Sequence, residues 1–357
     1  MAHPEIKITM TQNKKIKPDE NKLSFGKYFT DHMFVMDYDE GTGWHSPEIM
    51  PNEPFAIDPA AMVFHYGQAV FEGMKAYRTI DGNIALFRPE ANFKRLNDSN
   101  DRMCIPAIDE EFAIHALKEL IKIDEEWIPT APNTSLYIRP FIIATEAAVG
   151  VHPSRSYKFF IILSPVGPYY ASGLAPTNIL IENDYVRAVR GGIGYAKAAA
   201  NYAISLKGQQ KAIKKGYAQV LWLDGIERKY VEEVGTSNVF FVIGDDLVTP
   251  ELNGSILPGI TRNSVMTIAK SWGLNVVERK ISVDEVFAAA KDGTLKEAFG
   301  SGTAAVVSPV ANFIMGDESV QVGDGNIGQL AQKLYDTVTG IQFGKIEDSF
   351  GWIQLVK

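Results

Sequence analysis

A single lysine stands out in the stretch "GGIGYAKAAANYA", which runs from Gly191 to Ala203. Lys197 is surrounded there by glycine, alanine and tyrosine, and no acidic residue of the stretch can pair with its charge. One hypothesis is that its ammonium group reaches solvent beside small packing residues. The other is that its amine lies against a small, flat molecule, where partial desolvation lets it act as a nucleophile. The stretch by itself leaves both hypotheses open.

Two turns that contain glycine have the residues to bind an anion. "GSGTAA", from Gly300, has the spacing of a dinucleotide fingerprint, but it runs into the β-branched "VVSPV" where that fingerprint needs a helix. It can still offer backbone N–H groups and the Thr303 hydroxyl to an anion. "LPGITR" enters a predicted helix, whose first N–H groups near Ile260 and Thr261 have no partner within the helix. A single turn of this kind more often has a structural role than a role in binding. Two such turns near one isolated lysine suit a small phosphorylated cofactor.

Composition narrows the class of protein. The 357 residues exceed the usual size of one hydrophobic core, so two domains are expected. A formal net charge of -8 argues against a nucleic-acid partner. No apolar run is long enough for a membrane span, and the polar N-terminus resembles no targeting signal. The only cysteine, Cys104, excludes an intramolecular disulfide, and the histidines lack metal-ligand spacing. We therefore expect a cytoplasmic protein that acts on a small molecule, with no metal site.

The pattern of apolar residues predicts mixed secondary structure. Several hairpin-like strands beside helices favour an α+β fold with a mixed or barrel-like sheet over a repeated βαβ array. Ser282 and Glu285 have the spacing of a capping box that opens a short helix. Strands are expected over 135–144, 157–166, 217–224 and 274–282 and a hairpin over 238–250, with helices over 89–103, 110–127, 198–215 and 260–272.

Prolines and glycines between Ser164 and Asn178 predict a linker. The expected organisation is a mobile N-terminal arm (1–22), a small N-terminal domain (23–164), an interdomain linker (165–178) and a larger C-terminal domain (179–357).

A series of motifs resembles the branched-chain-amino-acid aminotransferases, which are fold-type IV enzymes that use pyridoxal 5′-phosphate (PLP). In chain order the motifs are "FTDHM", "HYGQAVFEGMKAY", "LFRPEANFKRL", "LYIRP", "SPVGPYY", "AKAAANY", "EEVGTSNVFF", "LPGITR" and "FGSGTAAVVSPV". The likeness covers nearly the whole chain. It implies a smaller N-terminal α/β domain, a larger mixed-sheet or barrel-like domain that anchors PLP, and a homodimer.

The resemblance implies that Lys197 forms the Schiff base with the cofactor aldehyde. Small neighbours would let the ring lie close, and the missing counter-ion would leave the amine easier to deprotonate. Glu233 would meet the pyridine nitrogen and keep the ring protonated, although by itself it is more typical of a solvated strand residue. Tyr202 would bond the ring oxygen. The remaining cofactor-binding residues that the resemblance implies are Arg95, Thr236, Ile260, Thr261 and Thr303, with the phosphate among Arg95, the backbone near Ile260 and Thr261, and Thr303.

The substrate pocket follows from the same resemblance. Its implied residues are Phe25, Tyr66, Phe71, Tyr137, Arg139, Val151 and Tyr169, with the α-carboxylate at Thr303 and Ala304. Such a pocket must accept both an aliphatic side chain and the charged side chain of glutamate, so an arginine has to be reachable. Arg139 fits that need, although a strand arginine is often simply paired with an acid.

Three hypotheses about function remain at this point. The leading one is reversible amino transfer between leucine, isoleucine or valine and 2-oxoglutarate. Another fold-type IV reaction is possible, such as that of a D-amino-acid transaminase or an aminodeoxychorismate-lyase-like enzyme, but "YIR" at Tyr137 replaces the arginine and histidine pair of the D-specific enzymes. A phosphate-binding module without catalysis would need neither Lys197 nor Glu233. Some animal relatives carry a Cys-x-x-Cys pair where this chain has Ala305 and Ser308, so no thiol switch is expected there.

Overall fold

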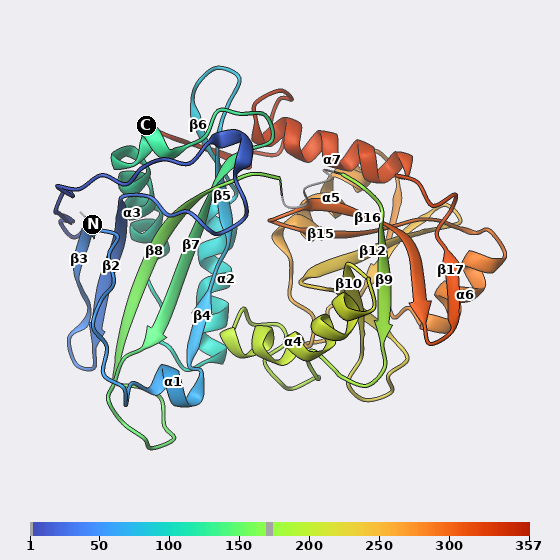
Figure 1. Ribbon diagram of the computed structural model, residues 1–357, viewed down its shortest axis with the longest axis horizontal. Helices are drawn as coiled ribbons and strands as arrows, with labels where there is room; N and C mark the ends of the chain where they lie inside the picture. Colours follow the sequence, from blue (N-terminus) through green and yellow to red (C-terminus); the bar gives the residue numbers. More distant parts are fainter. Residues whose placement is uncertain (1–2, 169–173) are drawn as a thin grey trace. The chain divides into compact units, whose positions relative to one another are not determined.

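The computed structural model describes residues 3–168 and 174–357 (Figure 1). The chain divides into two units. Unit 1 comprises Met1–Tyr169, Ala196–Ala200 and Ile341–Lys357, and unit 2 comprises Tyr170–Tyr195 and Asn201–Gly340. The segment around Lys197 and the C-terminal end, which the sequence assigned to the second domain, thus belong to unit 1, because their backbone hydrogen bonds run to its strands. The predicted linker contains residues 169–173, which lie outside the described residues.

Unit 1 is built on one sheet in which β1 runs parallel to β3 and the other neighbours are antiparallel. The strand order is β1-β3-β2-β8-β7-β5-β6-β18, and β4 pairs with β7. The two apolar runs that predicted strands form the long central pair, β7 and β8. The strands are β1 (Lys7–Ile8), β2 (His32–Asp39), β3 (Gly43–Pro51), β4 (Ala69–Phe71), β5 (Met74–Arg78), β6 (Ile84–Phe87), β7 (Ser135–Ala144), β8 (Ser156–Val166) and β18 (Ile353–Val356).

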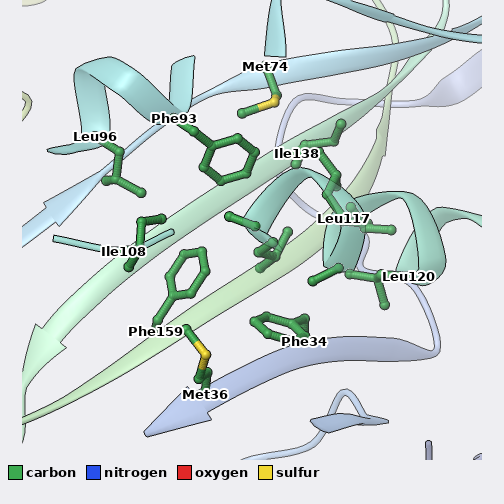
Figure 2. Packing of buried hydrophobic residues seen from close by; sticks show 14 of the residues in the cluster. Phe34, Met36, Met74, Phe93, Leu96, Ile108, Leu117, Leu120, Ile138 and Phe159 are labelled. Carbon is green, nitrogen blue, oxygen red and sulfur yellow. The ribbon is translucent and has the colours of Figure 1, made fainter. Parts of the chain in front are cut away.

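Two amphipathic helices supply the other half of the unit 1 core. They are α2 (Pro89–Arg102) and α3 (Glu110–Ile123), both close to their predicted bounds, while α1 (Met62–Tyr66) is short. Figure 2 shows Phe93 from α2 and Leu117 from α3 in the same cluster as Phe34 and Phe159 of the sheet. All these side chains are at most 1% exposed. The core therefore fixes α2, which carries Arg95, against the sheet.

The N-terminal segment has hydrogen bonds to unit 1. The Thr11 N–H donates to His32 Nε2 at 3.0 Å, and the Lys15 N–H donates to Asp31 at 2.7 Å. The 3-10 turn η1 (Glu20–Lys22) follows, and η2 (Glu125–Trp127) lies after α3. The mobility expected for residues 1–22 stays a prediction, to be weighed against these bonds.

Unit 2 contains a closed ring of strands. Its sheet has the order β11-β10-β9-β16-β15-β12-β13-β14, and an additional pairing of β11 with β12 closes the first part of this path on itself. The ring is mixed, because β9 is parallel to both β10 and β16. The predicted barrel-like sheet is therefore confirmed. Its strands are β9 (Thr177–Glu182), β10 (Gln219–Leu223), β11 (Val231–Val234), β12 (Ser237–Ile243), β15 (Leu295–Gly302) and β16 (Val306–Met315), with β13 (Asp246–Pro250), β14 (Asn275–Arg279) and β17 (Glu318–Gln321) outside the ring.

The helices of unit 2 are α4 (Ala199–Lys214), α5 (Ile260–Ser271), α6 (Val283–Lys291) and α7 (Gln329–Gln342), of which α4 and α7 extend into the segments of unit 1. The predicted bounds of two of them agree with α4 and α5 to within one residue, and α6 begins where the capping pattern predicted it, whereas α7 was not predicted. The chain leaves α4 at Gly216 with φ +82°, a left-handed conformation that favours glycine. Gly208 lies against the buried Trp222, where an added Cβ would come within 2.6 Å of the ring. Among the described residues, no helix has the length and apolarity to cross a membrane.

We predict that Ser282→Ala destabilises the protein through the start of α6. The Ser282 Oγ accepts the Glu285 N–H at 3.1 Å, as the sequence predicted, whereas the Glu285 side chain pairs with Arg279 and not with the backbone of the cap. Loss of such a cap costs about 1 kcal/mol. Urea unfolding should show this loss for Ser282→Ala but only a small change for Ser282→Asn, which keeps a side-chain acceptor. Equal stability of wild type and the alanine variant would contradict the cap.

Candidate active site

The backbone of Lys197 is fixed to unit 1. Its carbonyl accepts the Phe71 N–H at 3.0 Å, and its own N–H donates to Ser99 Oγ at 2.9 Å. Next to it, Val70 and Ala198 form an antiparallel bridge. The lysine therefore lies beside β4 and α2, held by groups that do not involve its amine.

Aromatic rings and an arginine lie near the Lys197 amine. The ring centre of Phe71 is 5.1 Å from Lys197 Nζ and 4.6 Å from Arg139 Cζ. The Arg139 Nη2 donates to the Tyr137 hydroxyl at 2.9 Å, and the Tyr137 and Phe25 rings meet at 4.8 Å. Gly73 gives the hydroxyl room, because a Cβ there would come within 2.2 Å of it. Five of the predicted site residues thus form one cluster in unit 1.

Arg139 has no acidic partner among the described residues. Its side chain is half-buried, stacks on two aromatic rings and donates to Tyr137, while its Nε is buried without a hydrogen-bond partner. The guanidinium of Arg139 therefore still has N–H groups that can donate hydrogen bonds to a carboxylate. The interpretation of Arg139 as an ordinary ion-paired strand residue is therefore not supported.

A buried ion pair lies beside the lysine. Glu72 is fully buried, and its two oxygens accept Arg95 Nε at 2.7 Å and Nη2 at 2.9 Å. The Asn92 amide donates to Glu72 at 2.8 Å. Burial alone would raise the pKa of the Glu72 carboxyl, but the charge and hydrogen bonds of Arg95, with a further contribution from Lys197, hold it below its usual value. Arg95 is thus oriented by a carboxylate that stays ionised.

The other predicted substrate residues of unit 1 are more exposed. Tyr66 is 38% exposed and donates its hydroxyl to the Val149 carbonyl, and Val151 is 86% exposed. Among the described residues, neither side chain has a hydrogen bond, ion pair or ring contact with the Lys197 cluster. Tyr169 lies outside the described residues.

Glu233 is buried on β11 in unit 2. Its side chain is oriented by two groups: Arg187 Nη2 lies 3.3 Å from Oε1, and the Leu257 N–H donates to Oε1 at 2.8 Å. Glu233 is only 3% exposed, so the interpretation of a solvated strand residue is wrong. A carboxylate held in this way is suited to a protonated nitrogen of a ligand.

Most of the other predicted cofactor residues lie at one end of the barrel. Asn238 of β12 is the register partner of Ser301 of β15, and its amide donates to the Leu257 carbonyl at 2.9 Å. The turns after β11 and β15 and the start of α5 therefore come together. At this end are Thr236, Ile260, Thr261, Thr303 and Ala304, while the half-buried Tyr202 lies on α4.

The start of α5 is suited to an anion. Gly259 at its N-cap has no side chain, and no side-chain cap is present among the described residues. Helix N-termini attract anions through their N–H groups and dipole. "GSGTAA" ends β15 and turns into β16 without a helix, which excludes the dinucleotide fingerprint.

Comparison with known proteins gives the family. The family model described as "Amino-transferase class IV" matches residues 69–313. "Branched-chain-amino-acid aminotransferase 2" of Bacillus subtilis is 60% identical over 352 residues, which is 99% of this chain and 97% of that protein. The chain belongs to the class IV aminotransferase family. The resemblance to the branched-chain-amino-acid aminotransferases is thereby confirmed.

More distant relatives agree with this result. A protein of Mycolicibacterium smegmatis with the name "Branched-chain-amino-acid aminotransferase" is 49% identical over 92% of this chain and 91% of its own. The crystal structure of the Escherichia coli branched-chain amino acid aminotransferase is similar with a TM-score of 0.77 at 29% identity, covering 92% of this chain and 99% of that one. The branched-chain aminotransferase from Thermoproteus uzoniensis with norvaline has a TM-score of 0.75 at 25% identity, covering 91% and 100%.

The residues present fit PLP, the cofactor of this family. A pyridine nitrogen needs a buried carboxylate, which Glu233 provides with Arg187 behind it. A phosphate needs N–H donors and a guanidinium; the start of α5 in unit 2 has such N–H groups, and Arg95 in unit 1 has such a guanidinium. The aldehyde needs a lysine amine beside a flat surface, as at Lys197 and Phe71.

Sequence reasoning missed three residues that hold these groups. Glu72, Ser99 and Arg187 contact Arg95, Lys197 and Glu233 respectively. For Glu72 a signal was present, because it is a lone acid inside the apolar run "AVFEGMKAY" and such an acid needs a partner when buried. For Ser99 and Arg187 the local sequence contains no comparable signal.

We predict that Glu72→Gln costs about 3 to 5 kcal/mol of stability, because it leaves Arg95 buried without a counter-charge. Glu72→Gln/Arg95→Met should cost less than the sum of its single variants. Since the pKa of Glu72 is lowered by folding, its contribution is present above its unfolded pKa and is lost as pH falls through the folded value. The difference between wild type and Glu72→Gln should therefore shrink on acidification.

Urea unfolding from about pH 7 to about pH 4 measures both effects. The matched control is Glu126→Gln, which removes an exposed carboxylate paired with Lys14 and Lys17 and should change stability much less. Additive losses in the double variant would show that the pair is not coupled.

Proposed function

We propose that this protein catalyses reversible amino transfer between leucine, isoleucine or valine and 2-oxoglutarate, with PLP as cofactor. The observation that carries the proposal is the cluster in unit 1, where the Phe71 ring lies near both the Lys197 amine and Arg139, which has no acidic partner in the described chain. An amine nucleophile beside an aromatic surface suits transamination, and an available guanidinium suits a dicarboxylate co-substrate. The relatives with 49% to 60% identity support the branched-chain substrate class.

Lys197 has two tasks in this proposal. Its amine would hold the cofactor aldehyde, and the free amine would move a proton at the substrate Cα. PLP, when bound, supplies the electron sink that makes the Cα–H bond acidic. The backbone hydrogen bonds with Phe71 and Ser99 hold the Lys197 main chain in place and do not involve its amine.

The other residues proposed to hold PLP each contact one part of the cofactor. Glu233 holds the proton on the pyridine nitrogen, with Arg187 fixing its orientation. Tyr202 donates to the ring oxygen. The phosphate is held by Arg95, the Ile260 and Thr261 N–H groups, Thr236 and Thr303.

The substrate side chain lies among aromatic and aliphatic groups. Phe25, Phe71 and Tyr137 supply the apolar wall, and Arg139 receives the distal carboxylate of glutamate. The α-carboxylate binds at the turn of Thr303 and Ala304. The further residues proposed for the pocket are Tyr66, Val151 and Tyr169.

We also propose a cytoplasmic homodimer. The exposed side chains near Tyr66 support the dimer, because Phe64 is 61% exposed, Val149 71% and Val151 86%. Apolar side chains gathered in this way favour cover by another protein surface. Sedimentation of the holoenzyme is expected to show twice the mass of one chain.

We predict that Lys197→Ala abolishes multiple-turnover transamination, because it removes the amine that binds the aldehyde and carries the proton. A coupled assay with leucine and 2-oxoglutarate measures the loss. Lys207→Ala, an exposed lysine on α4, is the matched control and should keep wild-type turnover. Near-normal turnover of Lys197→Ala with an unchanged visible absorbance would refute the role.

We predict that Arg139→Met acts selectively on the dicarboxylate half-reaction. A hydrogen bond to a charged group contributes about 1.5 to 3 kcal/mol, so kcat/KM for glutamate should fall about tenfold to a hundredfold more than for leucine. Stopped-flow absorbance measures both half-reactions on one preparation. Arg155→Met, which removes an exposed arginine paired with Glu146, controls for loss of charge. Equal losses for leucine and glutamate would make Arg139 a purely structural residue.

A further inference from the structure

A second pocket lies in unit 2, around the turn between β10 and β11. It is bounded by that turn, by β11, and by the segment after β13. Its lining includes Arg190, Tyr230, Glu232, Asn253, Ser255 and Lys280. None of them belongs to the groups proposed to hold PLP or the amino-acid substrate.

Glu232 provides a buried acceptor in this pocket. It is 2% exposed and, because side chains alternate along β11, it points away from the face that carries Glu233. One oxygen accepts the Ser255 hydroxyl and, at 3.4 Å, the Asn253 amide, and both donors also line the pocket. The other oxygen, Oε2, is buried and has no hydrogen-bond partner in the described chain.

An unpartnered carboxylate oxygen in this position needs a donor. Leaving a buried polar atom unsatisfied is unfavourable, and a charged oxygen more so. Burial raises the pKa of the Glu232 carboxyl, although the Ser255 and Asn253 hydrogen bonds and the Arg187 charge oppose the shift. A ligand N–H group at Oε2 would satisfy the oxygen and favour the ionised form.

Two positive side chains line the same pocket. Arg190 and Lys280 are exposed, and neither has an ion pair with any residue that the structure describes. The Lys280 Nζ lies 4.7 Å from the Tyr230 ring centre. Asp224 is not available as their partner, because its oxygens accept four backbone N–H groups of its own turn. Glu227 and Glu251 also line the pocket, and among the described residues neither forms an ion pair with Arg190 or Lys280. The pocket thus combines a buried acceptor with two cations that can contact a carboxylate.

We propose that this pocket binds a small zwitterion of the amino-acid type, with its ammonium group on Glu232 Oε2 and its carboxylate at Arg190 and Lys280. A simple cation would satisfy Glu232 but not the two positive groups, and a simple anion would leave Oε2 without a donor. The segment that carries Ser255 also holds Glu233, through the Leu257 N–H, and bonds Arg187 through the Ser255 carbonyl. One segment of chain therefore lines the pocket and also contacts Glu233, the carboxylate proposed to bind the pyridine nitrogen of PLP.

Calorimetric titration of the holoenzyme with N-methylglycine tests the proposal. This zwitterion keeps N–H donors but, as a secondary amine, does not condense with the cofactor aldehyde as an amino acid does. Glycine betaine is the matched ligand control, since it has both charges and no N–H donor. Saturable binding of N-methylglycine without binding of betaine is expected, and the visible absorbance reports separately on any reaction at Lys197.

Two variants assign the binding to this pocket. Arg190→Gln/Lys280→Gln and Glu232→Gln should each weaken binding about tenfold or more, as expected for the loss of a charged partner. Lys215→Gln, an exposed lysine outside the pocket, should leave the affinity unchanged. Because Arg190 and Lys280 are exposed, their double variant stays informative if Glu232→Gln fails to fold. Absence of binding, equal binding of betaine, or wild-type affinity of the double variant would overturn the proposal.

Discussion

The attachment of the Lys197 backbone to unit 1 is the constraint on which the proposed chemistry depends. The segment Ala196–Ala200 belongs to unit 1, although the chain before it and after it belongs to unit 2, so its contacts in unit 1 fix the position of the lysine. Phe71 and Ser99 hold both backbone groups of the lysine. The Ser99 hydroxyl also donates to the Arg95 carbonyl at 3.0 Å, so one side chain links the lysine to the helix that carries the proposed phosphate ligand. The amine itself takes no part in this attachment, so the chemistry proposed for it leaves the backbone in place.

Within each unit, charged groups of the proposed site have a partner of opposite charge. Glu72 neutralises Arg95 and fixes its plane, and Arg187 does the same for Glu233. Arg139 differs, because it rests on aromatic rings and has no acid beside it in the described chain. Burying a charge without a partner costs free energy. The cost is smaller for a half-buried guanidinium that rests on aromatic faces. This is the property that a pocket needs when it must accept leucine and glutamate in turn.

Local pattern predicted most of the fold, and long-range pairing accounts for what it missed. The helices α2, α3 and α5 and the hairpin of β12 and β13 follow from periodicity and turn residues. The pairing of β18 with β6 and the membership of Lys197 in unit 1 join segments far apart in the chain, which no local window contains. The same limit applies to the site. Lys197 stood out because of the residues around it in the sequence. The roles proposed for Glu233 and Arg139 came from family resemblance. Arg187 could be found only from its contact with Glu233 in the folded chain.

Lys75 and Lys197 of unit 1 are both candidates for the proposed role, which makes the site of cofactor attachment the most direct test. Burial lowers the pKa of Lys75 on β5 to about 8, so its amine is easier to deprotonate than that of an exposed lysine. Borohydride reduction of the holoenzyme makes the bond between PLP and its lysine permanent, and mass spectrometry of the digested protein then identifies that residue. We expect the phosphopyridoxyl group on Lys197 alone. Its attachment to Lys75, or its distribution over several lysines, would contradict the mechanism.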